Sequence, residues 1–346
     1  YPIFQDTYNN AGSVDTVKPM TVDKKRVPTH LTLNKLPSLP QVLVRILDAV
    51  SQESADFQQL SSIIRQDSAM SARLIAVANS SYYRRQHSCD TVDRALMCLG
   101  LETVRTLVIT AAVKQYFSYF DKDHQQFMTR FWRRSLISAH CAQTFASLSG
   151  YQGQSQAYLC GLLMDVGQLC LLAENDSACL ALWHPANGES ELQLLDAERK
   201  AFDITHAELG AALLDSWQMD NFMADAVRYH HAAGPDIRHA HHLVKIVNLS
   251  SQVSAQAELN DKTLAVANDL FGFNEDLLRE LHTRIAADVR RIAGGLGVAS
   301  EEDDPALAQQ ANRELGEKLG QLTQLQALQQ TLPGEVKPQT AGHAGA

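Results

Sequence analysis

The segment that most constrains the fold of this chain is Tyr158–Ala173, with the sequence YLCGLLMDVGQLCLLA. It is almost wholly apolar, and polar runs at 152–156 and 174–177 bound it. This length and composition predict a buried central helix. Asp165 lies in the middle of the segment, and a carboxylate without a partner is costly to bury. We therefore expect Asp165 to pair with a cation, a hydrogen-bond donor or a metal ion, or to line a cleft. A structural ion pair between two helices is the simplest of these roles.

The composition is that of a globular protein with a substantial core. The chain has 346 residues, of which 45% are hydrophobic, enough for one large or two ordinary domains. Its formal net charge is −9. Proteins that bind nucleic acid through bulk charge usually carry a basic surface, so we expect no nucleic-acid partner.

The cysteines and the lack of recognisable targeting signals indicate a cytoplasmic protein. Six cysteines are scattered along the chain without a C-x-x-C pair, which is typical of buried free thiols in a reducing compartment. The sequence shows no signal peptide and no run of about 18 uncharged apolar residues. We therefore expect no association with a membrane. Because the sequence begins at Tyr1 and not at Met, the presence of an upstream segment stays open.

Apolar residues recur at spacings of three and four along most of the chain, which predicts an all-α fold. Residues 1–30 are interpreted as an extension. A helical subdomain is expected over 31–120, and two prolines after Leu36 mark the start of its first helix. Asp67 is placed to cap one helix, and Gly100 to end another in the left-handed conformation. Further helices of this subdomain are predicted at 56–66, 68–81, 91–100 and 101–117.

A second helical subdomain is expected over 121–259. Thr205 and Glu208 form a capping-box signature that begins a helix with His206 at its first position. A later helix is predicted to end in the histidine pair at 230 and 231, where polar or cationic side chains suit the C-terminal carbonyl groups. The helices predicted here, besides the central one, cover 124–150, 203–217, 221–231 and 241–259.

Residues 260–332 are predicted to form a C-terminal helical extension. Its last segment, 306–330, has a leucine stripe that suits either a packed amphipathic helix or a short coiled-coil seam. A homodimer could form through this stripe. The tail, 333–346, is expected to be disordered. The stripe consists of Leu315, Leu319, Leu322, Leu325 and Leu328.

The residue types of a hydrolytic metal site occur at Asp165, His206, His230 and His231. Neutral imidazoles and a carboxylate suit iron, manganese, nickel or zinc. Histidines at helix termini are common and usually structural, so the pattern alone leaves both interpretations open. The run HAHH at 239–242 is interpreted as a solvated turn rather than a set of ligands.

A set of sequence motifs carries a resemblance to a known family. They are LPSLPQVLVRIL, IIRQDSAMSARLIAVANSSYY, DRALMCLGLETVRTLVI, FWRRSLISAH, YLCGLLMDVGQLCLL, HAELGAALLDSW and AVRYHH. In this order they resemble the HDOD domain family, a bacterial signalling branch of the HD phosphohydrolase superfamily. The resemblance covers roughly residues 36–255. It implies a multi-helical HD-like domain that follows an N-terminal helical subdomain.

The resemblance also implies that the HD metal site is degenerate. Catalytic members of the superfamily hold metal with a His on an early helix, an adjacent His-Asp pair and a later Asp. These positions match Arg134, Met164, Asp165 and Ser251, so only Asp165 keeps a ligand of the expected type. A thioether suits soft metals, not those of phosphoester hydrolysis. Arg134 would bring a permanent positive charge that pairs with Asp165 in place of the cation.

Two functions follow from the resemblance. The first is a non-catalytic signalling or regulatory module that acts through contacts with a partner protein, with no catalytic residue and no cofactor expected. The alternative is a residual metal-dependent phosphohydrolase that acts on a nucleotide or cyclic dinucleotide. In that case iron, manganese, nickel or zinc would be held by Asp165, His206, His230 and His231. The resemblance implies that the three histidines lie at positions often retained in HDOD proteins. They could instead hold a small anion. DNA binding through a helix pair at 56–81 conflicts with the net charge.

Overall fold

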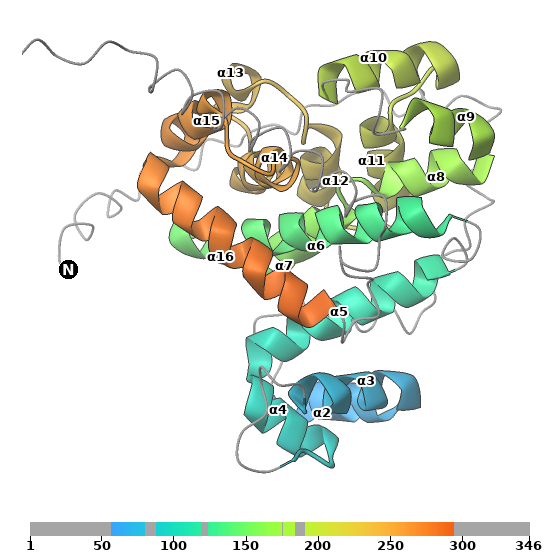
Figure 1. Cartoon of the computed structure of the whole chain (residues 1–346), viewed down its shortest axis with the longest axis vertical. Helices are drawn as coiled ribbons and strands as arrows, with labels where there is room; N and C mark the ends of the chain where they lie inside the picture. The colour runs from blue at the N-terminus through green and yellow to red at the C-terminus, as the bar shows by residue number, and fades with distance from the viewer. Residues whose placement is uncertain (1–56, 80–87, 119–123, 175, 184–190, 294–346) are drawn as a thin grey trace, which may run out of the picture. The chain divides into compact units, whose positions relative to one another are not determined.

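The computed structural model of the chain describes residues 57–79, 88–118, 124–174, 176–183 and 191–293 (Figure 1). The chain divides into two compact units after Val298, and all the described residues lie in the first. Within these residues every regular element is a helix, which confirms the all-α prediction. Some predictions concern residues outside the described ranges. They are the extension at 1–30, the helix that starts after Leu36, the leucine stripe at 306–330 and the tail at 333–346.

The N-terminal helices end where the sequence predicts breaks. The Asp67 side chain accepts a hydrogen bond from the N–H of Met70 at 3.0 Å, so Asp67 caps its helix as predicted. Gly100 joins two helices that are bent by 116° relative to each other. Its φ of 81° is positive as predicted, but its ψ of 158° lies outside the left-handed helical region. These helices are α2 (Phe57–Arg65), α3 (Ser68–Ala78), α4 (Val92–Leu99) and α5 (Leu101–Phe117).

The helices that follow form the packed group that carries the candidate site. The helices α6, α7 and α14 contact one another, α8 contacts α11, and α12 packs against α11, α14 and α7 (Figure 1). Short helices α9 (Asp176–Leu182) and α13 (Gly234–Ile237) and the longer α10 (Glu191–Phe202) connect them. The bounds of the packed helices are α6 (Gln125–Leu148), α7 (Gln154–Leu163), α8 (Val166–Glu174), α11 (His206–Ser216), α12 (Asn221–Arg228) and α14 (His242–Ser254).

The central apolar segment is buried and helical, but it forms two helices instead of the predicted one. The helix α7 ends at Leu163 and α8 begins at Val166, with a turn at Met164 and Asp165. The N–H of Gln168 donates to the carbonyl of Asp165 at 2.9 Å, an i, i+3 bond that is tighter than an α-helical one. The interruption therefore coincides with the one carboxylate of the segment.

By length and composition alone, the stretch Gln154–Glu174 could cross a membrane, and α4 with α5 could form another span if the bent pair acted as one. Within Gln154–Glu174, 83% of the most apolar window is buried inside the fold. A core helix of a folded domain has the same property. The expected lack of membrane association stays a prediction.

The described part of the C-terminal extension packs onto the preceding helices. It consists of α15 (Asp261–Phe271) and α16 (Glu275–Ala293). The helix α16 contacts α6, and α15 contacts α14 and α16. The apolar face of α16 is buried, with Leu278, Ile285 and Val289 between 0% and 5% exposed. These two helices are therefore part of the same core as the candidate site.

No disulfide joins any of the six cysteines, all of which lie in the described residues, as predicted. Burial raises the pKa of Cys141, Cys160 and Cys170 above its usual value. A thiol with a raised pKa is a poor nucleophile and a poor metal ligand. These cysteines therefore contribute to packing and not to the chemistry of the site.

Candidate functional site

The fold brings the predicted site residues to one place. Asp165 comes from the turn between α7 and α8, His206 from the first position of α11, and Arg134 from α6. His230 and His231 lie in the turn after α12 and not at the end of the helix as predicted, because α12 ends before them. The carboxylate and the three imidazoles are almost completely buried, with exposed fractions between 0% and 5%.

The start of α11 is held by a capping box and by a close contact with α8. Thr205 Oγ1 accepts a hydrogen bond from the N–H of Glu208 at 3.3 Å, and Glu208 Oε2 accepts one from the N–H of Thr205 at 3.1 Å, as predicted. A Cβ atom at Gly167 in α8 would come within 1.9 Å of the His206 carbonyl oxygen. Glycine at this position therefore allows α8 to approach α11 and brings Asp165 close to His206.

The turn that contains His230 and its neighbour is held by Asn248 of α14. The Asn248 side-chain amide donates towards the carbonyl groups of Tyr229 at 3.2 Å, His230 at 3.1 Å and Ala232 at 2.9 Å. Its own amide oxygen accepts a hydrogen bond from Gln252 at 2.8 Å. Because Asn248 is fully buried, these carbonyl groups of the turn after α12 are satisfied inside the fold.

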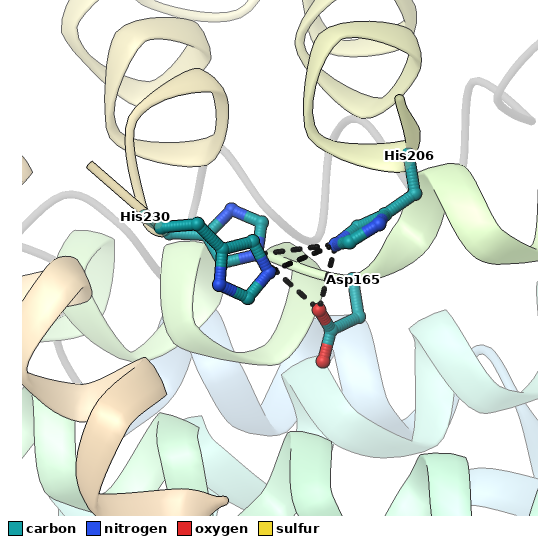
Figure 2. A group of neighbouring side chains, drawn as sticks. Asp165, His206 and His230 are labelled. Atoms are coloured by element: carbon teal, nitrogen blue, oxygen red, sulfur yellow. Dashed lines mark hydrogen bonds and ion pairs between the residues drawn. The ribbon is translucent and has the colours of Figure 1, made fainter. Parts of the chain in front are cut away.

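The carboxylate and the imidazoles converge through Asp165 Oδ1 and the Nε2 atoms of the three histidines. The Asp165 oxygen lies 3.3 Å from His230 Nε2 and 3.5 Å from His206 Nε2 (Figure 2). His206 Nε2 lies 3.4 Å from His230 Nε2 and 3.1 Å from His231 Nε2. All four atoms lie within 4.8 Å of one another. Three nitrogen donors and one oxygen donor thus surround a common centre.

The second nitrogen of each imidazole faces an acceptor. The contacts are His206 Nδ1 to Glu198 Oε2 at 2.8 Å, His231 Nδ1 to Glu191 Oε2 at 3.0 Å, and His230 Nδ1 to the Val227 carbonyl oxygen at 2.5 Å. A neutral imidazole that donates from Nδ1 has its lone pair on Nε2. Metal-binding histidines are typically oriented by such contacts. The cluster therefore has the orientation that a metal site needs.

Arg134 binds the other oxygen of Asp165. Arg134 Nε lies 3.1 Å from Asp165 Oδ2, and Nη2 donates to Glu191 Oε1 at 2.7 Å. Nη2 also lies 3.4 Å from Ser251 Oγ. The ion pair expected from the sequence is therefore present. Because Arg134 binds Oδ2, the other oxygen of Asp165, Oδ1, faces the imidazoles. Among the described residues, this buried oxygen has no hydrogen-bond partner.

Met164 and the HAHH run have structural contacts outside the cluster. Met164 is buried, and its sulfur accepts a hydrogen bond from Ser138 Oγ at 3.0 Å. His241 accepts one from the N–H of Leu243 at 3.3 Å, and its ring stacks on Phe222 with the centroids 3.9 Å apart. In the described part of the chain, the histidine and carboxylate groups that could hold a metal ion are those around Asp165.

The electrostatic environment of the cluster perturbs its titratable groups. Burial alone would raise the pKa of Asp165, but Arg134 and the adjacent imidazoles outweigh burial and hold this pKa well below its usual range. Burial alone would lower the pKa of His206, but Glu198 and Asp165 outweigh burial and raise it to about 10. Burial, followed by a neighbouring imidazole, lowers the pKa of His231 to about 4. The carboxylates on either side of His206 therefore favour its protonated form.

Glu191 and Glu198 of α10 are site residues that sequence reasoning missed. Glu198 is fully buried, and it also accepts a hydrogen bond from Trp183 Nε1 at 2.9 Å. The i, i+7 spacing of the two glutamates places them on one face of α10, which is a signal that the sequence offers. Asp196 in the same helix is exposed, however, so residue type alone does not identify the acidic residues that point inward.

Comparisons with known proteins place the chain in a family. The family model of the HDOD domain matches residues 36–233, which is more than half of the chain. An uncharacterized protein of Treponema pallidum (strain Nichols) is 23% identical over 201 residues. That match covers 58% of this chain and 38% of the relative, so the chain spans well under half of that protein's length.

Solved structures share the fold at low sequence identity. An HDOD domain protein of unknown function from Geobacter sulfurreducens is 20% identical, with a TM-score of 0.59 over 75% of this chain and 92% of that chain. A proposed phosphohydrolase from Shewanella amazonensis SB2B is 22% identical, with a TM-score of 0.58 over 77% of this chain and 96% of that chain. A proposed signal transduction protein from Marinobacter aquaeolei VT8 is 22% identical, with a TM-score of 0.60 over 76% of this chain and 60% of that chain. By the extent of the family match, this chain belongs to the HDOD domain family.

Proposed function

We propose that this HDOD protein is a non-catalytic signalling module that acts through contacts with a partner protein. The observation that carries the proposal is the position of Arg134, whose guanidinium binds Asp165 and Glu191 beside Ser251. In hydrolytic HD sites, as the family resemblance implies, this space belongs to a cation that activates water. A guanidinium supplies positive charge to the carboxylates, but it cannot coordinate and deprotonate a water molecule.

The burial of the cluster supports the same proposal. The side chains of Asp165 and His206 are 3% and 0% exposed, whereas those of Arg134 and Glu191 are 25% and 31% exposed. The Arg134–Glu191 pair is thus the more solvent-exposed part of the site. A phosphoester that approached Asp165 from this side would have to break an ion pair between these groups. The Marinobacter protein of similar fold, a proposed signal transduction protein, agrees with a signalling role.

One observation favours the alternative function, a residual metal-dependent phosphohydrolase acting on a nucleotide or cyclic dinucleotide. The three imidazoles and Asp165 form a set of ligand atoms, and the Shewanella protein of similar fold is a proposed phosphohydrolase. Hydrolysis also needs an open coordination position or a second ion. The positions where the resemblance leads us to expect the remaining metal ligands are occupied by Arg134, Met164 and Ser251. We therefore rank this function second.

A phosphodiesterase assay separates the two functions. With manganese added, we expect the full chain to hydrolyse neither bis(p-nitrophenyl) phosphate nor a cyclic dinucleotide above background, because the Arg134 guanidinium lies where the water-activating cation would bind. The variant His231→Gln should give the same background rate. A manganese-dependent rate that His231→Gln abolishes would overturn the non-catalytic proposal.

Cytoplasmic localisation, the partner protein and self-association through the leucine stripe at 306–330 stay predictions. Sedimentation of the full chain over a range of concentrations tests self-association. If the stripe forms a coiled-coil seam, we expect a monomer–dimer equilibrium that shifts to monomer when Leu319 and Leu322 are replaced by Asn. A chain that stays monomeric at all concentrations would contradict the homodimer.

A further inference from the structure

Carboxylates outnumber the permanent cations around the histidine cluster. Asp165, Glu191 and Glu198 contribute three carboxylates, and Arg134 contributes one guanidinium. Three negative charges and one positive charge leave a formal charge of −2 while the imidazoles are neutral. An excess of charge inside a protein is costly because the interior solvates it poorly. One divalent cation would offset this excess.

The distances among the donor atoms fit a metal ion better than a set of hydrogen bonds. Four of the six distances among the donor atoms lie between 3.1 and 3.5 Å; they join Asp165 Oδ1 and His206 Nε2 to each other and to His230 Nε2, and His206 Nε2 to His231 Nε2. Each of the four residues offers a ligand atom within 4.8 Å of the others. Donors that are about 2.0–2.1 Å from a tetrahedral ion lie about 3.3–3.4 Å from one another. Most hydrogen bonds between nitrogen and oxygen are shorter, at about 2.9–3.0 Å. Asp165 Oδ1 has no hydrogen-bond partner among the described residues, and coordination to an ion would give this buried oxygen a positively charged contact.

We propose that Asp165, His206, His230 and His231 bind one divalent transition-metal ion, best matched by zinc, while Arg134 takes the place of a second cation. Three nitrogen donors and one oxygen donor suit the borderline ions from iron to zinc and not magnesium or calcium. The inference rests on the proposed function, because four protein ligands give a closed, structural site and not a catalytic one. This proposal departs from the expectation of no cofactor. That expectation considered the metal ligands that are replaced in the sequence and not the geometry of the residues that remain.

The ion would join three parts of the fold that are distant in sequence. Asp165 precedes α8, His206 begins α11, and the adjacent histidines follow α12. A structural ion stabilises the folded state by the free energy of its binding, because the unfolded chain does not hold its ligands together. The proposed role of the site is therefore to fix the arrangement of the helices that a signalling partner meets.

Glu198 is a positioning residue in this proposal. Glu198 Oε2 accepts a hydrogen bond from the N–H of His206 at 2.8 Å and faces His206 Nδ1 at 2.8 Å. Trp183 Nε1 holds the other carboxylate oxygen at 2.9 Å. These contacts orient the ring so that Nε2 points to the cluster. Removal of such an outer carboxylate commonly weakens metal binding about 10- to 100-fold, and we expect Glu198→Gln to weaken zinc binding by this amount.

The zinc content of the purified full chain tests the site. Protein that has been stripped with a chelator, reloaded with zinc and desalted should retain about one zinc ion per chain. The variant His231→Gln should retain less than about a tenth of that amount, because it loses one of four ligands. The matched control is His239→Gln, a substitution of the exposed first histidine of the HAHH run, which should retain the wild-type amount. Circular dichroism shows whether each variant is folded.

Cobalt gives a second readout that is independent of any activity. Co²⁺ bound by four nitrogen and oxygen ligands should give intense visible absorption that saturates at one equivalent in the wild type and is lost in His231→Gln. The proposal is overturned if the wild type retains no zinc, if His231→Gln retains the wild-type amount, or if the zinc is lost only in His239→Gln. If His231→Gln does not fold, the zinc affinity of Glu198→Gln decides, and an unchanged affinity overturns the site.

The two proposals fail in different experiments. A chain without zinc overturns the metal site and leaves the phosphodiesterase result unchanged. A manganese-dependent phosphodiesterase activity overturns the non-catalytic role and leaves the bound ion in place.

Discussion

Gly167→Ala is expected to unfold the protein or to lower its free energy of unfolding by at least about 3 kcal/mol. A Cβ atom at this position would lie 1.9 Å from the carbonyl oxygen of His206 and 2.7 Å from the backbone nitrogen of Gly210. Both atoms belong to the backbone of α11, so neither can rotate away. The helices α8 and α11 would have to separate by more than about 1 Å, and the packed interior resists such a shift.

Gly234→Ala is the matched control for this substitution. The nearest atom to a Cβ at Gly234 is Val266 Cγ2 at 3.4 Å, an ordinary contact. We therefore expect a change within about 1 kcal/mol. Urea denaturation followed by circular dichroism measures both variants. Equal stability of the two would contradict the close approach of α8 to α11. If Gly167→Ala is obtained only as insoluble protein while Gly234→Ala is soluble, the result supports the close approach of α8 to α11.

Local patterns in the sequence predict much of the fold. Apolar spacing predicts α5 over 101–117, and the structure has this helix at Leu101–Phe117. The capping box at Thr205 and the cap at Asp67 were also correct, because a cap depends on side chains within three residues of the helix start. Features that a few neighbouring residues decide can be read from one sequence.

Features that depend on distant residues could not be predicted in this way. The helix predicted at 221–231 ends at Arg228 because Asn248, from another helix, binds the carbonyl groups of the next turn. The burial of Glu198 depends on Trp183 and His206, which lie on other elements. The turn at Asp165 accompanies the close approach of Gly167 to α11. None of these contacts has a signature in the local pattern of apolar residues.

The candidate site shows the same division between local and non-local information. The sequence provides the residue types at 134, 165, 206, 230 and 231, and it supports the ion pair between Arg134 and Asp165 that the structure contains. It does not show that one oxygen of Asp165 faces Arg134 while the other faces the histidines. Counting the metal ligands that the sequence has lost treats the site as a single metal centre. The geometry divides it into a guanidinium half and an imidazole half.

Arg134→Ala should lower the free energy of unfolding of the metal-stripped protein by about 3–5 kcal/mol, because it removes the guanidinium that pairs with the buried Asp165. Arg134 Nε lies 3.1 Å from Asp165 Oδ2, and the Asp165 side chain is 3% exposed. The matched control is Arg238→Ala, which removes a surface pair. Arg238 Nη2 lies 2.8 Å from Asp269 Oδ2, with side chains that are 55% and 44% exposed. Exposed pairs contribute about 0–1 kcal/mol, so the control should change little.

Zinc should reduce the cost of Arg134→Ala, because an ion on Asp165 Oδ1 supplies positive charge to the same carboxylate that the arginine neutralises. Denaturation of both proteins with and without zinc forms a cycle whose coupling should be about 0.5–3 kcal/mol, as for groups that share a partner. Equal costs in the two conditions would show that Arg134 and the ion do not act on the same carboxylate. If Arg134→Ala is as stable as Arg238→Ala, Arg134 does not take the place of a cation.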